Sequence, residues 1–82
     1  MGKYDPLEGH LRRQTAPVYY MCFRDIERLL ACLLPRRAQR AEWWTNGHAT
    51  GERPVQAHAW LNAGYHAVLL EDERVRFERI AV

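Results

Sequence analysis

Four prolines interrupt the chain, at positions 6, 17, 35 and 54. Proline lacks an amide proton and is excluded from helix interiors and from central strands. Each of these positions therefore marks the start or the end of an element, so the elements between them are short. The chain has 82 residues, a length that suits one domain, residues 1–82, with one small core.

The hydrophobic pattern between these breaks predicts three helices, one early strand and a C-terminal hairpin. The expected helices are residues 6–14, 24–34 and 54–63, and a further helical segment is expected at 36–44. The strands are expected at 18–23, 65–70 and 74–80. The clearest helix, 24–34, carries an apolar stripe at the helical spacing i, i+3, i+4 and i+7, formed by Ile26, Leu29, Leu30 and Leu33.

Residues 18–23 are apolar, aromatic or small and show no polar alternation. A strand of this kind is expected to be covered on both faces. It can add to the hairpin as a third strand, which an isolated hairpin needs for stability. The element order then predicts an α+β fold resembling a winged helix-turn-helix. The connection between the second and third helices is far longer than the turn of a tight helix-turn-helix.

The type of the charged residues is more informative than the net charge of the chain. Twelve basic and ten acidic residues give a net charge of +2, and eleven of the twelve are arginine. The planar guanidinium suits bidentate contact with phosphate, although a GC-rich genome would also enrich arginine. The basic excess lies in residues 35–54, around the sequence Pro-Arg-Arg-Ala-Gln-Arg.

This distribution leads to the first functional hypothesis, a small regulatory or phage-related protein that binds double-stranded DNA as a homodimer. The helix 54–63 would enter a groove, and arginines on either side of it would hold phosphates. The predicted nucleic-acid-binding residues are Arg36, Arg37, Arg40, Gln56, His58, Asn62, Arg74 and Arg76. In this hypothesis Arg74 and Arg76 lie on the outer strand of the hairpin, and His58, Ala59 and Asn62 lie on the outward face of the helix.

The alternative is a protein-interaction module that uses an exposed tryptophan. Trp43 and Trp44 are adjacent, so in a regular helix or strand both cannot face one core. One is expected in the core and the other at an edge, at a partner surface or against a base. Asn46 completes this predicted partner site. Three acidic residues at the hairpin tip, Glu71–Glu73, favour this alternative, because a wing that approaches DNA rarely carries three negative charges.

Other functions find less support in the sequence. No catalytic residues, cofactor or metal are predicted, because the chain has no phosphate-binding glycine loop, no nucleophile elbow and no close pair of Cys or His. A zinc site would have to combine the widely spaced Cys22, Cys32, His48 and His58. Two cysteines, no signal-like start and no run of about 20 apolar residues predict a cytoplasmic protein without membrane contact.

A set of motifs covers nearly the whole chain: KYDPL at 3–7, FxxIE at 23–27, LPxxA at 34–38, WWxN at 43–46, AWLxAGY at 59–65 and VxFxR at 75–79. The set resembles a family of small bacterial domains of unknown function. Cys22 stands where Ser or Thr is usual, and Tyr65 replaces a commoner Trp. The resemblance implies a bacterial or phage-borne single-domain protein. It implies no activity, although the WWxN motif would be the shared site if the family has one.

Overall fold

The computed structural model describes residues 2–46 and 54–80. In chain order the elements are α1 (Asp5–Arg12), β1 (Val18–Cys22), α2 (Phe23–Leu30), the 3₁₀ helices η1 (Arg36–Gln39) and η2 (Ala41–Trp44), α3 (Val55–Asn62), β2 (Tyr65–Leu70) and β3 (Arg74–Arg79). This confirms an α+β fold with three α-helices, an early strand and a C-terminal hairpin. None of the helices in the described part of the chain has the length and apolar character needed to cross a membrane.

The three strands form one antiparallel sheet in the order β1-β3-β2. The early strand therefore joins the hairpin, as the sequence predicts, with Tyr19 opposite Phe77. The hairpin places Ala67 opposite the other side of Phe77. The prediction that the strand carrying Arg74 and Arg76 is an outer strand is wrong, because β3 occupies the centre of the sheet.

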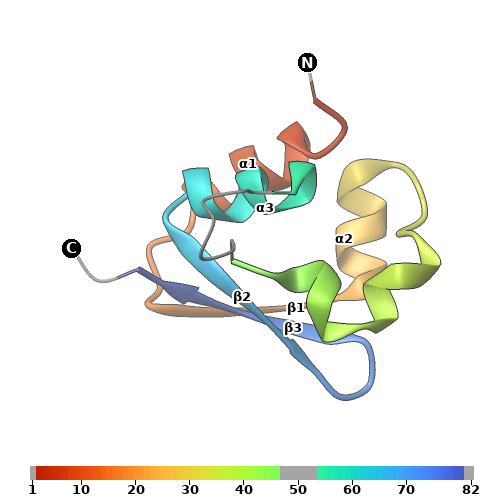
Figure 1. The fold of residues 1–82 in the computed structure, drawn as a ribbon. Coiled ribbons are helices and arrows are strands. Elements are labelled where there is room, and N and C mark those ends of the chain that lie inside the picture. Colours follow the sequence, from red (N-terminus) through yellow and green to blue (C-terminus); the bar gives the residue numbers. More distant parts are fainter. Residues whose placement is uncertain (1, 47–53, 81–82) are drawn as a thin grey trace.

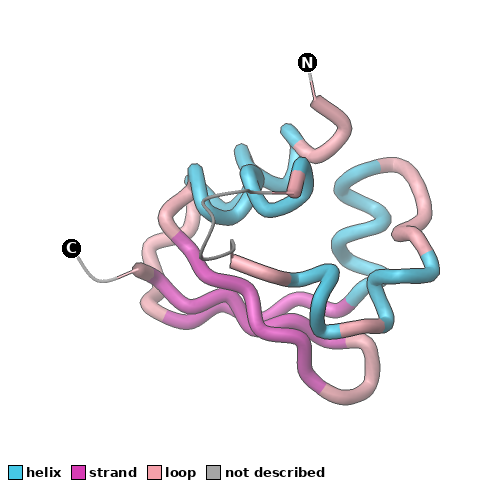
Figure 2. Tube along the Cα trace, viewed as in Figure 1, coloured by secondary structure: helices cyan, strands magenta, loops and turns pink. Residues whose placement is uncertain are grey.

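The helices all lie on one side of the sheet, and its other side is left uncovered (Figures 1 and 2). The core fills the space between these two layers. Its largest fully buried side chains are Trp60, Tyr65 and Phe77. Tyr65 is fixed at its polar end as well, because its hydroxyl donates to the carbonyl of Ala16 over 2.8 Å.

Helix α2 is shorter than its apolar stripe predicts. It ends at Leu30, and the next residue, Ala31, adopts a left-handed conformation with φ of 57°. Leu33, the last member of the predicted stripe, consequently leaves the core and is 79% exposed. The sequence predicts that Pro35 ends this helix, but the left-handed residue ends it four positions earlier.

Trp43 and Trp44 are both buried, with 8% and 2% of their surfaces exposed. They belong to a 3₁₀ helix, and their ring centroids lie 4.7 Å apart. Trp44 stacks on Trp60, whereas Trp43 meets the edge of Tyr4. The prediction that one tryptophan of the pair is exposed is therefore wrong.

Helix α3 also differs from its predicted faces. Ala57 and Trp60 point into the core as expected, but Ala59, placed on the outward face, is only 3% exposed. Helix α1 lies alongside α3 in the same layer and covers this side of it (Figure 1). The helix thus has two covered sides and a narrow exposed face.

Candidate nucleic-acid interface

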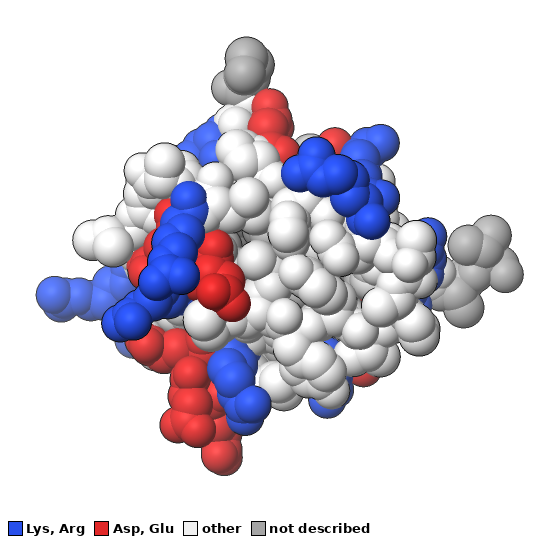
Figure 3. Space-filling view, turned by 180° about the vertical axis from the view of Figure 1, so that it is seen from behind, with Lys and Arg blue, Asp and Glu red and all other residues white. Residues whose placement is uncertain are grey.

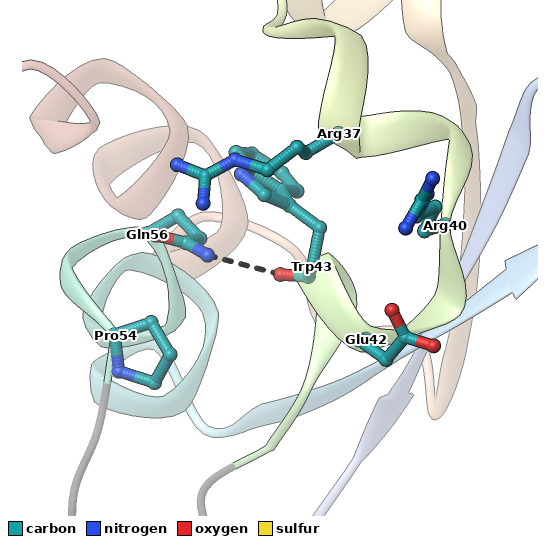
Figure 4. A pocket seen from close by; sticks show the side chains of 6 residues that line it. All are labelled: Arg37, Arg40, Glu42, Trp43, Pro54 and Gln56. Atoms are coloured by element: carbon teal, nitrogen blue, oxygen red, sulfur yellow. Dashed lines mark hydrogen bonds between the residues drawn. The ribbon is translucent and has the colours of Figure 1, made fainter.

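An open pocket of about 360 Å³ lies between the two 3₁₀ helices and the start of α3. Arg37 and Arg40 come from η1 and the residue after it, and Gln56 comes from the first turn of α3. The lining residues are Arg37, Arg40, Glu42, Trp43, Pro54 and Gln56. In Figure 4, Arg37 reaches across Trp43 towards Gln56, and Arg40 lies on the opposite side of the hollow.

The local folding of η1 and η2 explains why these arginines meet α3. Ala38, between the arginines, is fully buried, and its carbonyl accepts a hydrogen bond from the indole of Trp44 over 2.8 Å. This pins η1 to the core and leaves Arg37 and Arg40 exposed beside it. The side-chain amide of Gln56 donates to the carbonyl of Trp43 over 3.1 Å, which joins α3 to η2.

The pocket has the chemistry of an anion site. Two guanidinium groups offer forked donors that match phosphate oxygens. Pro54 immediately precedes α3, so the pocket lies at the N-terminal end of this helix, where unpaired amides and the helix dipole favour an anion. Glu42 is the one acidic residue among the described residues of the lining, and it reduces their summed charge without cancelling it.

The third predicted phosphate contact of this segment, Arg36, points elsewhere. It lines a separate hollow together with Arg24, Glu27 and Glu73. Glu73 belongs to the hairpin tip and accepts a hydrogen bond from the side chain of Gln39. The acidic tip therefore lies beside η1, where its carboxylates partly balance Arg36.

Arg74 and Arg76 do not line the pocket. Their side chains alternate with those of buried Val75 and Phe77, so they project from the uncovered side of the sheet, away from the helices. Arg76 is paired there with Glu78, with 3.0 Å between Nε and Oε2. The predicted arrangement, in which these two arginines flank the last helix, is wrong.

His58 and Asn62 also lie apart from the pocket. They line a smaller hollow between α3 and α1 that Asp5 and Glu8 share. The amide of Asn62 lies 3.4 Å from a carboxylate oxygen of Glu8. Of the eight predicted nucleic-acid-binding residues, the structure thus brings together Arg37, Arg40 and Gln56.

Asn46, from the predicted partner site, holds the outer edge of β2. Its amide donates to the carbonyl of Ala67 over 3.0 Å, and its oxygen accepts from the amide of Ala67 over 2.8 Å. The same oxygen accepts from the indole of Trp60 over 3.1 Å. Together with the burial of both tryptophans, these bonds account for the WWxN motif as a requirement of the fold.

Sequence reasoning missed a second surface, an open groove of about 400 Å³ between α1, β1 and α2. Tyr19, Met21 and Leu29 give its lining an apolar part, and His10, Asp25 and Arg28 give it a polar part. The one signal in the sequence was the uncharged stretch 18–22.

The zinc site considered from the sequence is not assembled among the residues that the structure describes. Across 2–46 and 54–80, no three side chains of His, Cys, Asp or Glu gather as metal ligands would. Cys22 and Cys32 are free thiols, both half-buried. His48 lies outside the described residues.

Comparison with family models, with curated proteins and with solved structures finds no match for this chain. The resemblance carried by its motifs therefore stays a prediction. The functional argument rests on the chemistry of the pocket.

Proposed function

We propose that this protein is a DNA-binding domain of winged-helix type that holds the phosphate backbone in the pocket of Arg37, Arg40 and Gln56. The observation that carries the proposal is the convergence of two exposed guanidinium groups on the N-terminal end of α3. Phosphate contacts of this kind supply most of the affinity of non-specific DNA binding.

The order of elements supports the winged-helix assignment. A helix, a strand, two further helices and a two-stranded wing follow one another in such domains, and α1, β1, α2, α3 and the β2–β3 hairpin follow the same order. The early strand pairs with the last strand. The long connection between α2 and α3 is the departure, and it is this connection that contributes the two arginines.

The charged residues around α3 favour contact with the DNA backbone over recognition of the bases. Asp5 and Glu8 lie next to the exposed face of the helix, and their charges would oppose the phosphates on either side of a groove. The start of α3 has Arg37 and Arg40 beside it instead. The protein is therefore expected to bind duplexes of different sequence with similar affinity.

The test measures fluorescence anisotropy of a labelled duplex of mixed sequence at several salt concentrations. The double variant Arg37→Gln/Arg40→Gln is expected to lose about tenfold or more in affinity. Its log–log salt slope should fall by about 2, because each lost phosphate contact removes about 0.9 from the slope.

A matched control removes the same charge from the neighbouring hollow. In Arg24→Gln/Arg36→Gln both substituted arginines lie among Glu27 and Glu73, so most of the affinity and the slope should remain. Equal losses in the two double variants would show that only net charge matters. Wild-type protein that does not bind DNA at low salt would refute the proposal.

The alternative of an adaptor with an exposed tryptophan loses its proposed contact, since Trp43 and Trp44 are both buried. A protein partner would have to bind at another surface, and the edge strand β1 offers one.

A further inference from the structure

The two edge strands of the sheet, β2 and β1, differ in whether other residues bond to their outward backbone groups. Along β2, the side chain of Asn46 pairs with both the amide and the carbonyl of Ala67. At the two ends of β1, the amide of Phe23 donates to the carbonyl of Glu73, and the carbonyl of Pro17 accepts from the amide of Arg79, so these groups point towards β3. Because bonding direction alternates along a strand, the backbone groups of Val18 and Tyr20 point away from the sheet, and no other described residue bonds to them.

Side chains on the outer face of this open edge are accessible, whereas on the helix side Met21 is buried and Tyr19 half-buried. On the uncovered face of the sheet, Val18 is 40% and Tyr20 57% exposed. On the helix side, the groove between α1, β1 and α2 runs beside the strand and is lined by Tyr19 and Met21. Seen from behind, the molecule presents a broad uncharged area with charged residues at its margins (Figure 3).

Soluble proteins usually protect such an edge with charge, proline or a bulge. Strand β1 has the sequence VYYMC and contains none of these in its paired length, and it pairs with β3 without interruption. Its sequence pattern is that of a strand covered on both faces, yet the outer face of β1 is open. Its outward backbone groups at Val18 and Tyr20 also have no partner among the described residues.

We propose that β1 pairs antiparallel with β1 of a second copy, about a two-fold axis through Tyr20, to give a continuous six-stranded sheet. This register places Tyr20 opposite Tyr20 and Val18 opposite Cys22 of the second copy. It brings together all five residues of the strand, and it uses the outward backbone groups of Val18 and Tyr20 together with the carbonyl of Cys22. The amide of Cys22 already donates to the carboxylate of Asp25 over 3.4 Å, so the Val18–Cys22 pair shares this donor with Asp25.

In this arrangement, the residues that flank β1 in one copy lie next to those that flank β1 in the other copy. The ring of His10 in the last turn of α1 bonds to the hydroxyl of Tyr19, which fixes the end of α1 above the start of β1. Helix α2 begins directly after β1, with Asp25 in its first turn. Antiparallel pairing therefore brings the end of α1, where Arg13 follows the Arg12 that is paired with Glu8, towards the start of α2 in the other copy, where Asp25 follows Arg24. The complementary pair across the interface is Arg13 with Asp25, and this pairing of an uncharged strand with its own copy favours a second copy over an unrelated peptide.

The first test is the mass in solution, measured by size-exclusion chromatography with light scattering. The chain mass is 9.7 kDa, and the wild type is expected at twice this value. Tyr20→Lys places a charge at the centre of the interface and should return the mass to that of one chain. Val55→Lys is the matched control, because Val55 is 71% exposed on α3 and its replacement should leave the dimer intact. Circular dichroism checks that both variants fold.

The second test reads the register. In a hydrogen-bonded antiparallel pair the Cα atoms lie about 5.5 Å apart, a separation that a disulfide can bridge. In a Cys32→Ser background, Val18→Cys should form an intermolecular disulfide with Cys22 of the second copy on mild oxidation. The Cys32→Ser variant alone should not form this disulfide, because the Cys22 residues of the two copies are offset by four positions, about 13 Å along the strands.

Three results would overturn the proposal. These are a wild type that remains at 9.7 kDa at high concentration, a dimer that Tyr20→Lys leaves unchanged, and a disulfide that forms equally well without Val18→Cys. None of them bears on DNA binding, which has its own variants.

Discussion

At the scale of single residues, Asn46 connects three parts of the molecule with one side chain. It pairs with both backbone groups of Ala67 and accepts the indole proton of Trp60. Asn46→Ala leaves all three groups without their partner. At about 1 kcal/mol for each hydrogen bond, and more where a buried donor is left unpaired, the free energy of unfolding should fall by about 2–4 kcal/mol in urea denaturation.

Asn62→Ala provides the comparison for this prediction. Asn46 and Asn62 are both exposed, but Asn62 has one described contact, the 3.4 Å approach to Glu8. Its replacement should change stability by less than about 0.5 kcal/mol. If both variants lose the same small amount, Asn46 does not support the sheet edge in the way its bonds indicate.

The tryptophans allow a prediction that needs no mutation. Trp43, Trp44 and Trp60 are 8%, 2% and 0% exposed. Quenching of the native fluorescence by acrylamide should therefore be weak, and it should rise strongly once urea unfolds the chain. Strong quenching in the native state would mean that at least one indole is accessible.

Sequence reasoning could not place these tryptophans, because it assumed the geometry of a regular helix or strand. In a 3₁₀ helix, successive side chains are about 120° apart, and Trp43 and Trp44 meet different neighbours, Tyr4 and Trp60. Both can be buried because η2 packs against β2, η1 and residues of α3, and this packing is a tertiary property. Spacing along the chain does not contain it.

At the scale of elements, the end of α2 stores strain that can be measured. Ala31 has φ of 57°, a conformation that costs a non-glycine residue about 1–2 kcal/mol. Glycine relieves this strain but gains about 0.4–1 kcal/mol of freedom in the unfolded chain. Ala31→Gly should thus raise the free energy of unfolding by about 0.5 kcal/mol.

Ala63 tests whether this effect comes from the backbone conformation. It follows α3 with an ordinary φ of −82°, so Ala63→Gly should lower stability by about 0.4–1 kcal/mol. Thermal unfolding of the two variants side by side checks the opposite signs. A loss in both would show that the left-handed residue is not strained.

The elements themselves follow from local sequence more closely than their arrangement does. Val18–Cys22 and Tyr65–Leu70 lie within or match the predicted strands, because β-branched and aromatic residues between turn signals suffice to identify a strand. The central place of β3 depends on pairing between segments more than fifty residues apart. For that reason the residues of the predicted site do not lie together. Arg74 and Arg76 alternate with core residues of a central strand, and their side chains project from the face of the sheet opposite to α3.

At the scale of the whole molecule, the pocket and the open edge lie at opposite sides of the sheet. The pocket adjoins η2, which packs on β2, and the edge is β1 at the other end of the strand order. A dimer through β1 would therefore leave both pockets free. Its two-fold axis is perpendicular to the sheet, so the helices of both copies lie on the same side.

This arrangement predicts how DNA affinity depends on duplex length. Strands lie about 4.7–4.9 Å apart, so a six-stranded sheet separates its outer strands by about 24 Å, and the pockets lie beyond them. A duplex of about 6 base pairs, roughly 20 Å long at 3.4 Å per pair, is too short to reach both pockets. One of about 24 base pairs can reach both, and the second contact then becomes intramolecular.

With a short duplex of about 6 base pairs, roughly 20 Å long at 3.4 Å per pair, which is below the separation of the outer strands, the ratio of affinities for the long and the short duplex should accordingly be at least about tenfold larger for the wild type than for Tyr20→Lys. Anisotropy titrations with both duplexes measure it, and the ratio of the variant corrects for the greater number of sites on a longer duplex. Arg37→Gln/Arg40→Gln should weaken binding to both duplexes while keeping the dimer mass. Equal ratios for the wild type and Tyr20→Lys would mean that the two pockets do not engage one duplex together, even if each binds phosphate and the chains pair through β1.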